Sequence, residues 1–245
     1  MTPAAADAYV KKLGLEPVSD NVKRLTEMIA KRGADLEDFA KIVAQDPELS
    51  ERLLRAANPR ATRKEDYKAT TVEAAVQRAG MSIALLLAMS DPLIRAVIKT
   101  FHTMLAIDLK TVTQKEIGEL VTEHVLGEVT FEGKTSGLVH LRLPTPSITV
   151  IGDRLLGLSP DDLADEAIAN DVIGELCNMI VGNFKSNLCD AGLTCKLSLP
   201  KITRTNDFKL HVVNNGTSER QGFHAPELDF FADLSVNPWV DKKLL

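Results

Sequence analysis

One long amphipathic segment constrains the fold of this chain more than any other feature. It begins with Ser159-Pro160-Asp161-Asp162, which combines an N-cap serine, a proline at the first helical position and an acidic first turn. We predict a long helix from there toward Cys189, leaving open a break near Glu166, with Gly192 just beyond its end. At about 100° per residue, the apolar side chains that fill a broad sector of this helix are Ile168, Val172, Ile173, Leu176, Met179 and Ile180.

A narrow polar stripe occupies the rest of this helix. Glu175, Asn178, Gly182 and Lys185 all fall within about 40° of Asp171 at helical spacing. An unpaired charge in a core is costly, so the stripe is expected to face water or a partner. Gly182 costs about 1 kcal/mol of helix propensity, and it would let another surface approach closely. From spacing alone, such a stripe is usually just the solvated face of an amphipathic helix.

Besides the apolar side chains, one cysteine and two asparagines of this helix lie outside the stripe. Cys177 points about 100° away from Asn178, and we expect it to be a small core residue rather than a nucleophile. Asn183 and Asn187 lie nearer the apolar side, and the sequence does not identify their partners.

The pattern Asp171-x-x-x-Glu175-x-x-Asn178, continued through Leu188, resembles the signature of the CheC/CheX/FliY phosphatases. The run from Glu175 to Gly182 is closest to the CheX branch of that family. Pro200 follows Asn178 by 22 residues, which agrees with the family pattern to within a residue. A single Glu-x-x-Asn unit also suits CheX rather than the two-site CheC. The resemblance covers roughly residues 91–240.

This resemblance implies a phosphatase for the phosphoaspartate of CheY-like response regulators. Hydrolysis of a phosphoryl group needs a positioned water and neutralised charge, with little covalent chemistry. Asn178 would orient the attacking water, because a carboxamide both donates and accepts hydrogen bonds. Glu175 would pair with the regulator's active-site lysine, and Asp171 would support docking. Gly182 and Lys185 would complete the partner-binding stripe.

The resemblance also sets expectations for cofactors and assembly. Mg²⁺ would be bound by the regulator's own acidic cluster, so no metal site and no cofactor are expected in this chain. A homodimer is implied because CheX is a dimer. A second hypothesis stays open, in which the chain is a non-catalytic receiver-binding or adaptor module that recognises a regulator without hydrolysing its phosphate.

The first 90 residues have the pattern of consecutive helices. Apolar spacing predicts helices from Val22 to a stop at Gly33 and from Leu36 to Val43. Asp46-Pro47 starts a helix that Asn58-Pro59 ends, a polar loop follows from Arg60 to Lys68, and Thr70-x-x-Glu73 resembles a capping box before a helix ending at Gly80. Residues 46–58 resemble the opening helices of HDOD domains, residues 71–80 fit the segment that follows, and the available length implies a truncated copy. A plain helical bundle of no particular family would show similar capping and periodicity.

Strand patterns appear in the second part of the chain. Asp91-Pro92 indicates another helix start, leading toward Leu105. The further expected elements are a half-buried strand at Val139–Leu143, a helix over residues 145–157, strands at 196–202, 208–213 and 228–234, and an Asn214-Asn215-Gly216 turn. We therefore predict an α+β fold: an all-α region over residues 1–90, then a CheX-like α/β domain over 91–245. Its expected features are an antiparallel-rich sheet and a long active-site helix.

Composition excludes several other classes of protein. The chain has 245 residues and a net charge of −5, and the part after residue 100 carries 13 basic and 20 acidic residues, a poor surface for nucleic acid. No apolar run approaches the ~18 residues of a membrane span, and the first residues lack the features of a signal peptide. Three cysteines without a CxxC pair favour a reduced, cytoplasmic setting. Five scattered histidines show no metal-ligand spacing.

Overall fold

The computed structural model describes residues 12, 20–30, 35–58, 68–119, 123–133, 135–190, 192–209 and 217–236. The helices are α2 (Asp20–Ala30), α3 (Leu36–Ala44), α4 (Pro47–Ala57), α5 (Val72–Ala79), α6 (Met81–Thr100), the π-helix η2 (Phe101–Leu105), α7 (Gln114–Ile117), α8 (Ser147–Leu156), the 3₁₀ turn η3 (Asp162–Ala164) and α9 (Glu166–Asp190). The strands are β1 (Lys110–Val112), β2 (His124–Gly133), β3 (Gly137–Pro144), β4 (Cys195–Leu197), β5 (Lys201–Thr205), β6 (Thr217–Ala225) and β7 (Leu228–Val236).

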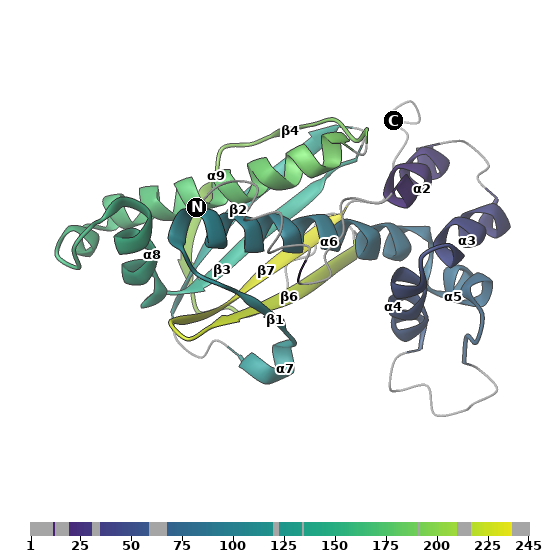
Figure 1. Cartoon of the computed structure of the whole chain (residues 1–245), viewed down its shortest axis with the longest axis horizontal. Coiled ribbons are helices and arrows are strands. Elements are labelled where there is room, and N and C mark those ends of the chain that lie inside the picture. The colour runs from purple at the N-terminus through teal and green to yellow at the C-terminus, as the bar shows by residue number, and fades with distance from the viewer. Residues whose placement is uncertain are drawn as a thin grey trace.

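The N-terminal helices α2 to α5 gather at one end of α6, as Figure 1 shows. Two helix boundaries lie where the sequence predicts them. The Asp46 carboxylate accepts a hydrogen bond from the Leu49 backbone N–H at 3.0 Å at the start of α4, and Gly80 ends α5 with a φ of 91°. The capping box at Thr70 is wrong by one residue, because the Thr71 hydroxyl caps α5. Gly33, Pro59 and most of the predicted loop, residues 60–67, lie outside the described residues.

Helix α6 runs from this bundle across the sheet without interruption. The predicted helix start at Asp91-Pro92 is therefore wrong, since Pro92 lies inside the 20-residue helix. A proline in a helix interior costs about 3 kcal/mol, and the burial of the flanking apolar side chains offsets that cost. By length and composition alone, the stretch Met81–Leu105 could cross a membrane, but 72% of its most apolar window is buried inside the protein.

The described strands form one antiparallel sheet in the order β1-β6-β7-β3-β2-β4, with β5 also paired to β2. Helices α6 and α9 lie over one face of it (Figure 1), against a layer of apolar side chains. That layer includes Val125, Val129, Phe131, Val139, Leu141, Phe230 and Leu234. This arrangement confirms the predicted α+β class, with a helical region followed by an antiparallel sheet and its covering helices.

The strand predictions are correct in part. The alternation at Val139–Leu143 predicts β3, but the strand is not half-buried: His140 and Arg142, its polar positions, are buried as well. The strand predicted at 196–202 is two short strands, because Pro200 cannot donate to the ladder and lies between β4 and β5. Phe208 begins no strand, and residues 210–216 lie outside the described part. The sequence did not predict β1, β2 or β6.

Candidate functional site

Helix α9 begins where the sequence left a break open. The short turn η3 comes first, and then the Asp165 carboxylate accepts a hydrogen bond from the Ala167 backbone N–H at 2.8 Å. Helix α9 continues for 25 residues from Glu166 to Asp190. Gly192 follows its end with a φ of 77°, the left-handed conformation that glycine adopts without strain.

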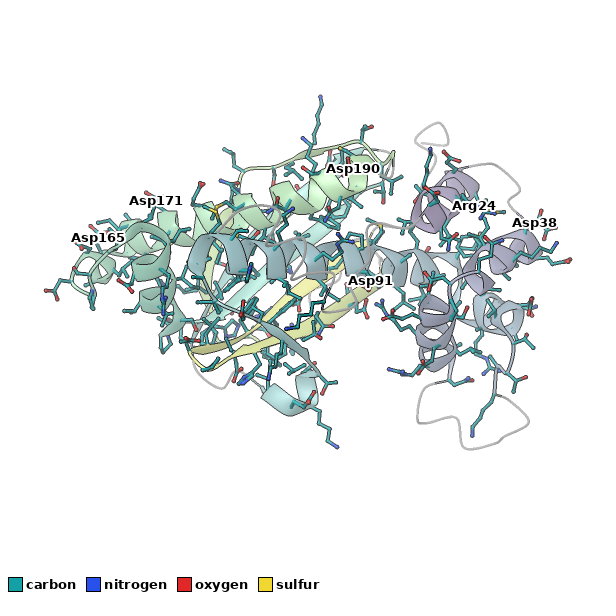
Figure 2. The ribbon with its side chains drawn as sticks, in the orientation of Figure 1. Arg24, Asp38, Asp91, Asp165, Asp171 and Asp190 are labelled. Atoms are coloured by element: carbon teal, nitrogen blue, oxygen red, sulfur yellow. The ribbon has the colours of Figure 1, made fainter. Side chains whose placement is uncertain are left out.

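The polar stripe lies on the outer side of α9. Asp171, Glu175 and Asn178 are exposed, while Gly182 and Lys185 are half-buried. Figure 2 places Asp171 toward one end of α9 and Asp190 toward the other. The remainder of the helix is largely buried in the core, including Val172, Leu176, Ile180 and Phe184. The predicted stripe is therefore a ridge of solvent-facing polar groups on an otherwise buried helix.

Contacts on the inner side of α9 hold this ridge in place. The Asn183 side-chain amide donates to the Thr100 hydroxyl oxygen at 2.9 Å, and the Asn187 amide donates to the Pro92 carbonyl at 3.2 Å. These are the partners that the sequence could not identify, and both lie on α6. The two asparagines therefore join α9 to α6 just behind Asn178 and Gly182.

Cys177 is part of this packing and not of the site chemistry. It is buried, and a side chain at Gly127 of β2 would collide with its sulfur. Burial raises the pKa of the Cys177 thiol to about 12, so the sulfur stays protonated at neutral pH. The thiolate is the nucleophilic form of cysteine, and the structure therefore confirms that Cys177 is a core residue.

A hollow of about 510 Å³ lies against the stripe. Its walls are Lys99 from α6, Thr103 and Met104 from η2, and Asn178, Met179, Gly182 and Asn183 from α9. Asn178 and Gly182 thus belong to both the stripe and the hollow. The residues contributed by α6 and η2 were not predicted as site residues, because their proximity to α9 depends on tertiary packing.

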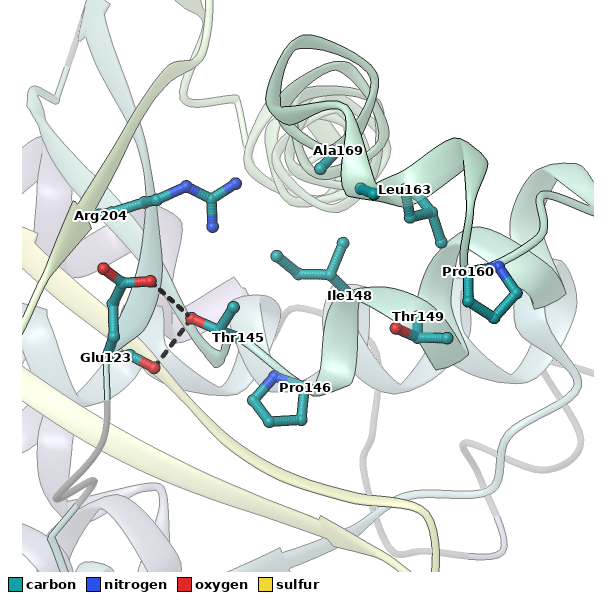
Figure 3. A pocket seen from close by; sticks show the side chains of 10 residues that line it. Glu123, Thr145, Pro146, Ile148, Thr149, Pro160, Leu163, Ala169 and Arg204 are labelled. Carbon is teal, nitrogen blue, oxygen red and sulfur yellow. Dashed lines mark hydrogen bonds between the residues drawn. The ribbon is translucent and has the colours of Figure 1, made fainter.

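A second hollow, of about 500 Å³, lies near the start of α9 (Figure 3). Its floor includes Ile148 and Leu163, and its rim carries Glu123 and Arg204. The Arg204 guanidinium is already engaged, since its Nε donates to Glu166 at 3.1 Å. No residue of the stripe lines this hollow, whereas Asn178 and Gly182 line the first one.

Metal ligation has no visible basis in the described part of the chain. Among those residues, no group of three or more His, Cys, Asp or Glu side chains is arranged to hold a metal ion. The polar groups on and beside the ridge are two carboxylates, one carboxamide and the side-chain ammonium groups of Lys99 and Lys185.

In this part of the chain, a largely buried helix with an exposed Glu-x-x-Asn ridge packs on an antiparallel sheet. Comparison with known families finds two matches. Residues 125–224 match the family "Chemotaxis phosphatase CheX", and residues 15–130 match the HDOD domain. The chain thus carries a CheX-type domain preceded by an HDOD-type helical region. The HDOD match extends past residue 90, and the boundary at residue 90 stays a prediction.

Solved structures agree with this fold. The chemotaxis protein CheX from Vibrio vulnificus is 19% identical with a TM-score of 0.52, covering 61% of this chain and 96% of that one. CheX from Desulfovibrio desulfuricans is 18% identical with a TM-score of 0.51, covering 61% and 99%. A CheX–CheY–BeF₃–Mg²⁺ complex from Borrelia burgdorferi also matches, at 19% identity, a TM-score of 0.48 and coverage of 61% and 97%. No curated protein matches the sequence.

Proposed function

We propose that this chain accelerates hydrolysis of the phosphoaspartate of a CheY-like response regulator, with Asn178 orienting the attacking water. The observation that carries the proposal is the position of Glu175 and Asn178, which lie exposed and one helical turn apart on α9. Both residues fall within the segment that matches the chemotaxis phosphatase family.

The chemistry follows from the groups on the ridge. A carboxamide accepts a hydrogen bond through its oxygen and donates through its nitrogen, so Asn178 can hold a water while contacting the phosphoryl group. Glu175 supplies a carboxylate for the regulator's lysine, a charge-assisted contact that fixes the approach of the two proteins. Mg²⁺ on the regulator would offset part of the phosphoryl charge, so that this chain contributes positioning rather than a metal.

The described N-terminal helices leave the ridge accessible. In Figure 2, Arg24 and Asp38 lie at the opposite end of the molecule from Asp171. Lys23 of α2 lies beside Gly192, which follows the C-terminal end of α9. A receiver domain can therefore reach Asn178 without displacing α2 to α5.

The first experiment measures the decay of a phosphorylated receiver domain with Mg²⁺, with and without this 245-residue chain. We expect Asn178→Ala to lower the acceleration by about 100-fold or more, the usual effect of removing one positioned catalytic group. Because Asn178 is exposed, the fold should be unchanged. Ser186→Ala, exposed two turns further along α9, is the matched control and should keep the native rate.

An adaptor without catalytic activity gives a different result. In that case the native chain binds the receiver, Glu175→Lys weakens binding, and neither protein changes the decay rate. Equal rates for the native chain and Asn178→Ala, with a receiver that binds both, would contradict the proposed role of Asn178.

A further inference from the structure

The hollow beside the stripe has walls that the proposed reaction does not use. Asn178 and Gly182 form one wall, while Lys99, Thr103 and Met104 come from the end of α6 and from η2. A surface that approaches closely enough for Asn178 to enter a receiver's phosphorylation site would also meet this second wall. The hollow is therefore continuous with the proposed contact.

The backbone of the second wall departs from a regular α-helix at this point. Residues Phe101–Leu105 form a π-helix, which widens the turn, and Ala106 ends it in the left-handed conformation with a φ of 56°. Such π-turns occur frequently at functional sites. Within this π-helix, Met104 is 50% exposed and lies beside the hollow, between the half-buried Thr103 and the buried Leu105.

This wall is held firmly against α9. The Asn183–Thr100 hydrogen bond joins the two helices at the base of the hollow, and the Thr103 hydroxyl donates to the Lys99 carbonyl at 2.6 Å. Lys99 and Met104 are therefore presented on a braced surface rather than on a loop, which lowers the entropy lost when a partner binds.

Negative and positive side chains lie on different sides of Asn178. Asp171 and Glu175 place negative charge toward the start of α9, whereas Lys99 borders the hollow and Lys185 lies further along the stripe. A phosphorylated receiver offers the complementary pair, a lysine for Glu175 and a phosphoryl group that carries close to two negative charges. The neutral Asn178 lies between these two charged regions.

We propose that this hollow is a docking subsite for the phosphorylated receiver, with the Lys99 ammonium facing its anionic phosphorylation site and Met104 packing against an apolar residue at the rim of that site. The inference rests on the proposed function and deepens it by naming the second contact surface. Lys99 and Met104 act in recognition, and the chemistry stays with Asn178.

The test compares initial dephosphorylation rates across receiver concentrations for the whole 245-residue chain and its variants. We expect Lys99→Glu and Met104→Asp to raise KM about tenfold or more while kcat stays within a few-fold of native. Removing a steering charge should also reduce the salt dependence of kcat/KM, so Lys99→Gln should respond less to added NaCl than the native chain. Lys110→Glu on β1 and Leu36→Asp on α3, both exposed and remote, are the matched controls.

Direct binding separates failure of the inference from failure of the proposed function. If Asn178→Ala abolishes acceleration while Lys99→Glu and Met104→Asp keep the native KM, the subsite is wrong and the phosphatase stands. If the native chain accelerates no receiver, binding of a receiver loaded with beryllofluoride and Mg²⁺ decides. If both variants bind this receiver more weakly than their controls do, the subsite is supported. If the variants bind as well as their controls, or if the native chain does not bind the receiver, the subsite is wrong.

Discussion

A row of ionisable side chains crosses four strands on the sheet face opposite α6 and α9. Glu128, His140, Asp233 and Arg220 lie directly opposite one another on β2, β3, β7 and β6. Side chains alternate between the two faces of a strand, so this row points away from the apolar layer. Arg220 binds the Asp233 carboxylate through two hydrogen bonds, of 2.6 and 2.7 Å. Such pairing is required when charges are buried.

The buried histidine in this row predicts a pH dependence of stability. His140 is 2% exposed, and burial lowers the pKa of its imidazole from 6.5, despite the Glu128 carboxylate at 3.0 Å. The folded protein therefore binds fewer protons at His140 than the unfolded chain does. The stability that the neutral His140 contributes is lost as the pH falls below about 6.5, the pKa of the unfolded histidine. We expect the free energy of unfolding to fall between pH 7.5 and 5.5, and His140→Gln to reduce that fall.

Urea titrations at the two pH values measure this difference directly. His224→Gln, a change at a half-exposed histidine paired with Asp229 on the same sheet, provides the control. A pH dependence that is the same in the native chain and in His140→Gln would show that the imidazole is not responsible.

At the scale of single elements, the pairing of α6 with α9 depends on a few polar contacts within an apolar interface. Asn183 bonds to Thr100, which is fully buried, so removing the amide leaves a buried hydroxyl without this partner. Losses of this kind cost about 1–3 kcal/mol. We expect Asn183→Ala to lower the free energy of unfolding by that amount, measured by urea denaturation.

The stripe offers the comparison for that prediction. Asn178→Ala makes the same chemical change less than two turns away on α9, at an exposed position, and should shift the free energy of unfolding by no more than about 0.5 kcal/mol. Equal destabilisation by both substitutions would mean that the Asn183–Thr100 bond contributes nothing particular. The two asparagines therefore separate a structural role from a proposed catalytic one.

At the scale of the whole molecule, α6 joins the HDOD-type helices to the sheet, and Arg52 strengthens that connection. From α4, its guanidinium reaches Asp91 of α6 at 2.6 Å and Glu219 of β6 at 3.1 Å. The Arg52 side chain is only 18% exposed. Within the part of the chain that the structure describes, the Arg52–Glu219 ion pair joins the helical bundle to the sheet, and Arg52 is not among the residues that line the hollow beside Asn178.

Removing the Arg52 side chain should destabilise the helical bundle more than the sheet. We expect Arg52→Met to cost about 1–3 kcal/mol, because it leaves Asp91 and Glu219 without their partner in a half-buried setting. Native-state hydrogen exchange should then quicken in α3 to α5 more than in β2 and β3. Arg55→Met removes an exposed pair with Glu51 from the same helix and should cost at most about 0.5 kcal/mol. Equal exchange in both variants would contradict a tethering role for Arg52.

The sequence by itself determined the features that depend on near neighbours in the chain. Helical periodicity identified α9 and its polar ridge, and cap residues such as Asp46 and Gly80 located helix ends, because spacings of three and four residues suffice for both. The residues from Glu175 to Pro200 likewise carry the resemblance to the CheX family within a single stretch of the chain.

Tertiary structure decided what depends on distant partners. Pro92 remains inside a helix because the surrounding core holds it there, and His140 is buried because the neighbouring strands supply its partners. Asn183 finds Thr100 across 83 residues of sequence, and the same approach of α6 to α9 creates the hollow beside Asn178. Local propensity carries no information about such contacts, since their free energy arises only when the two elements pack together.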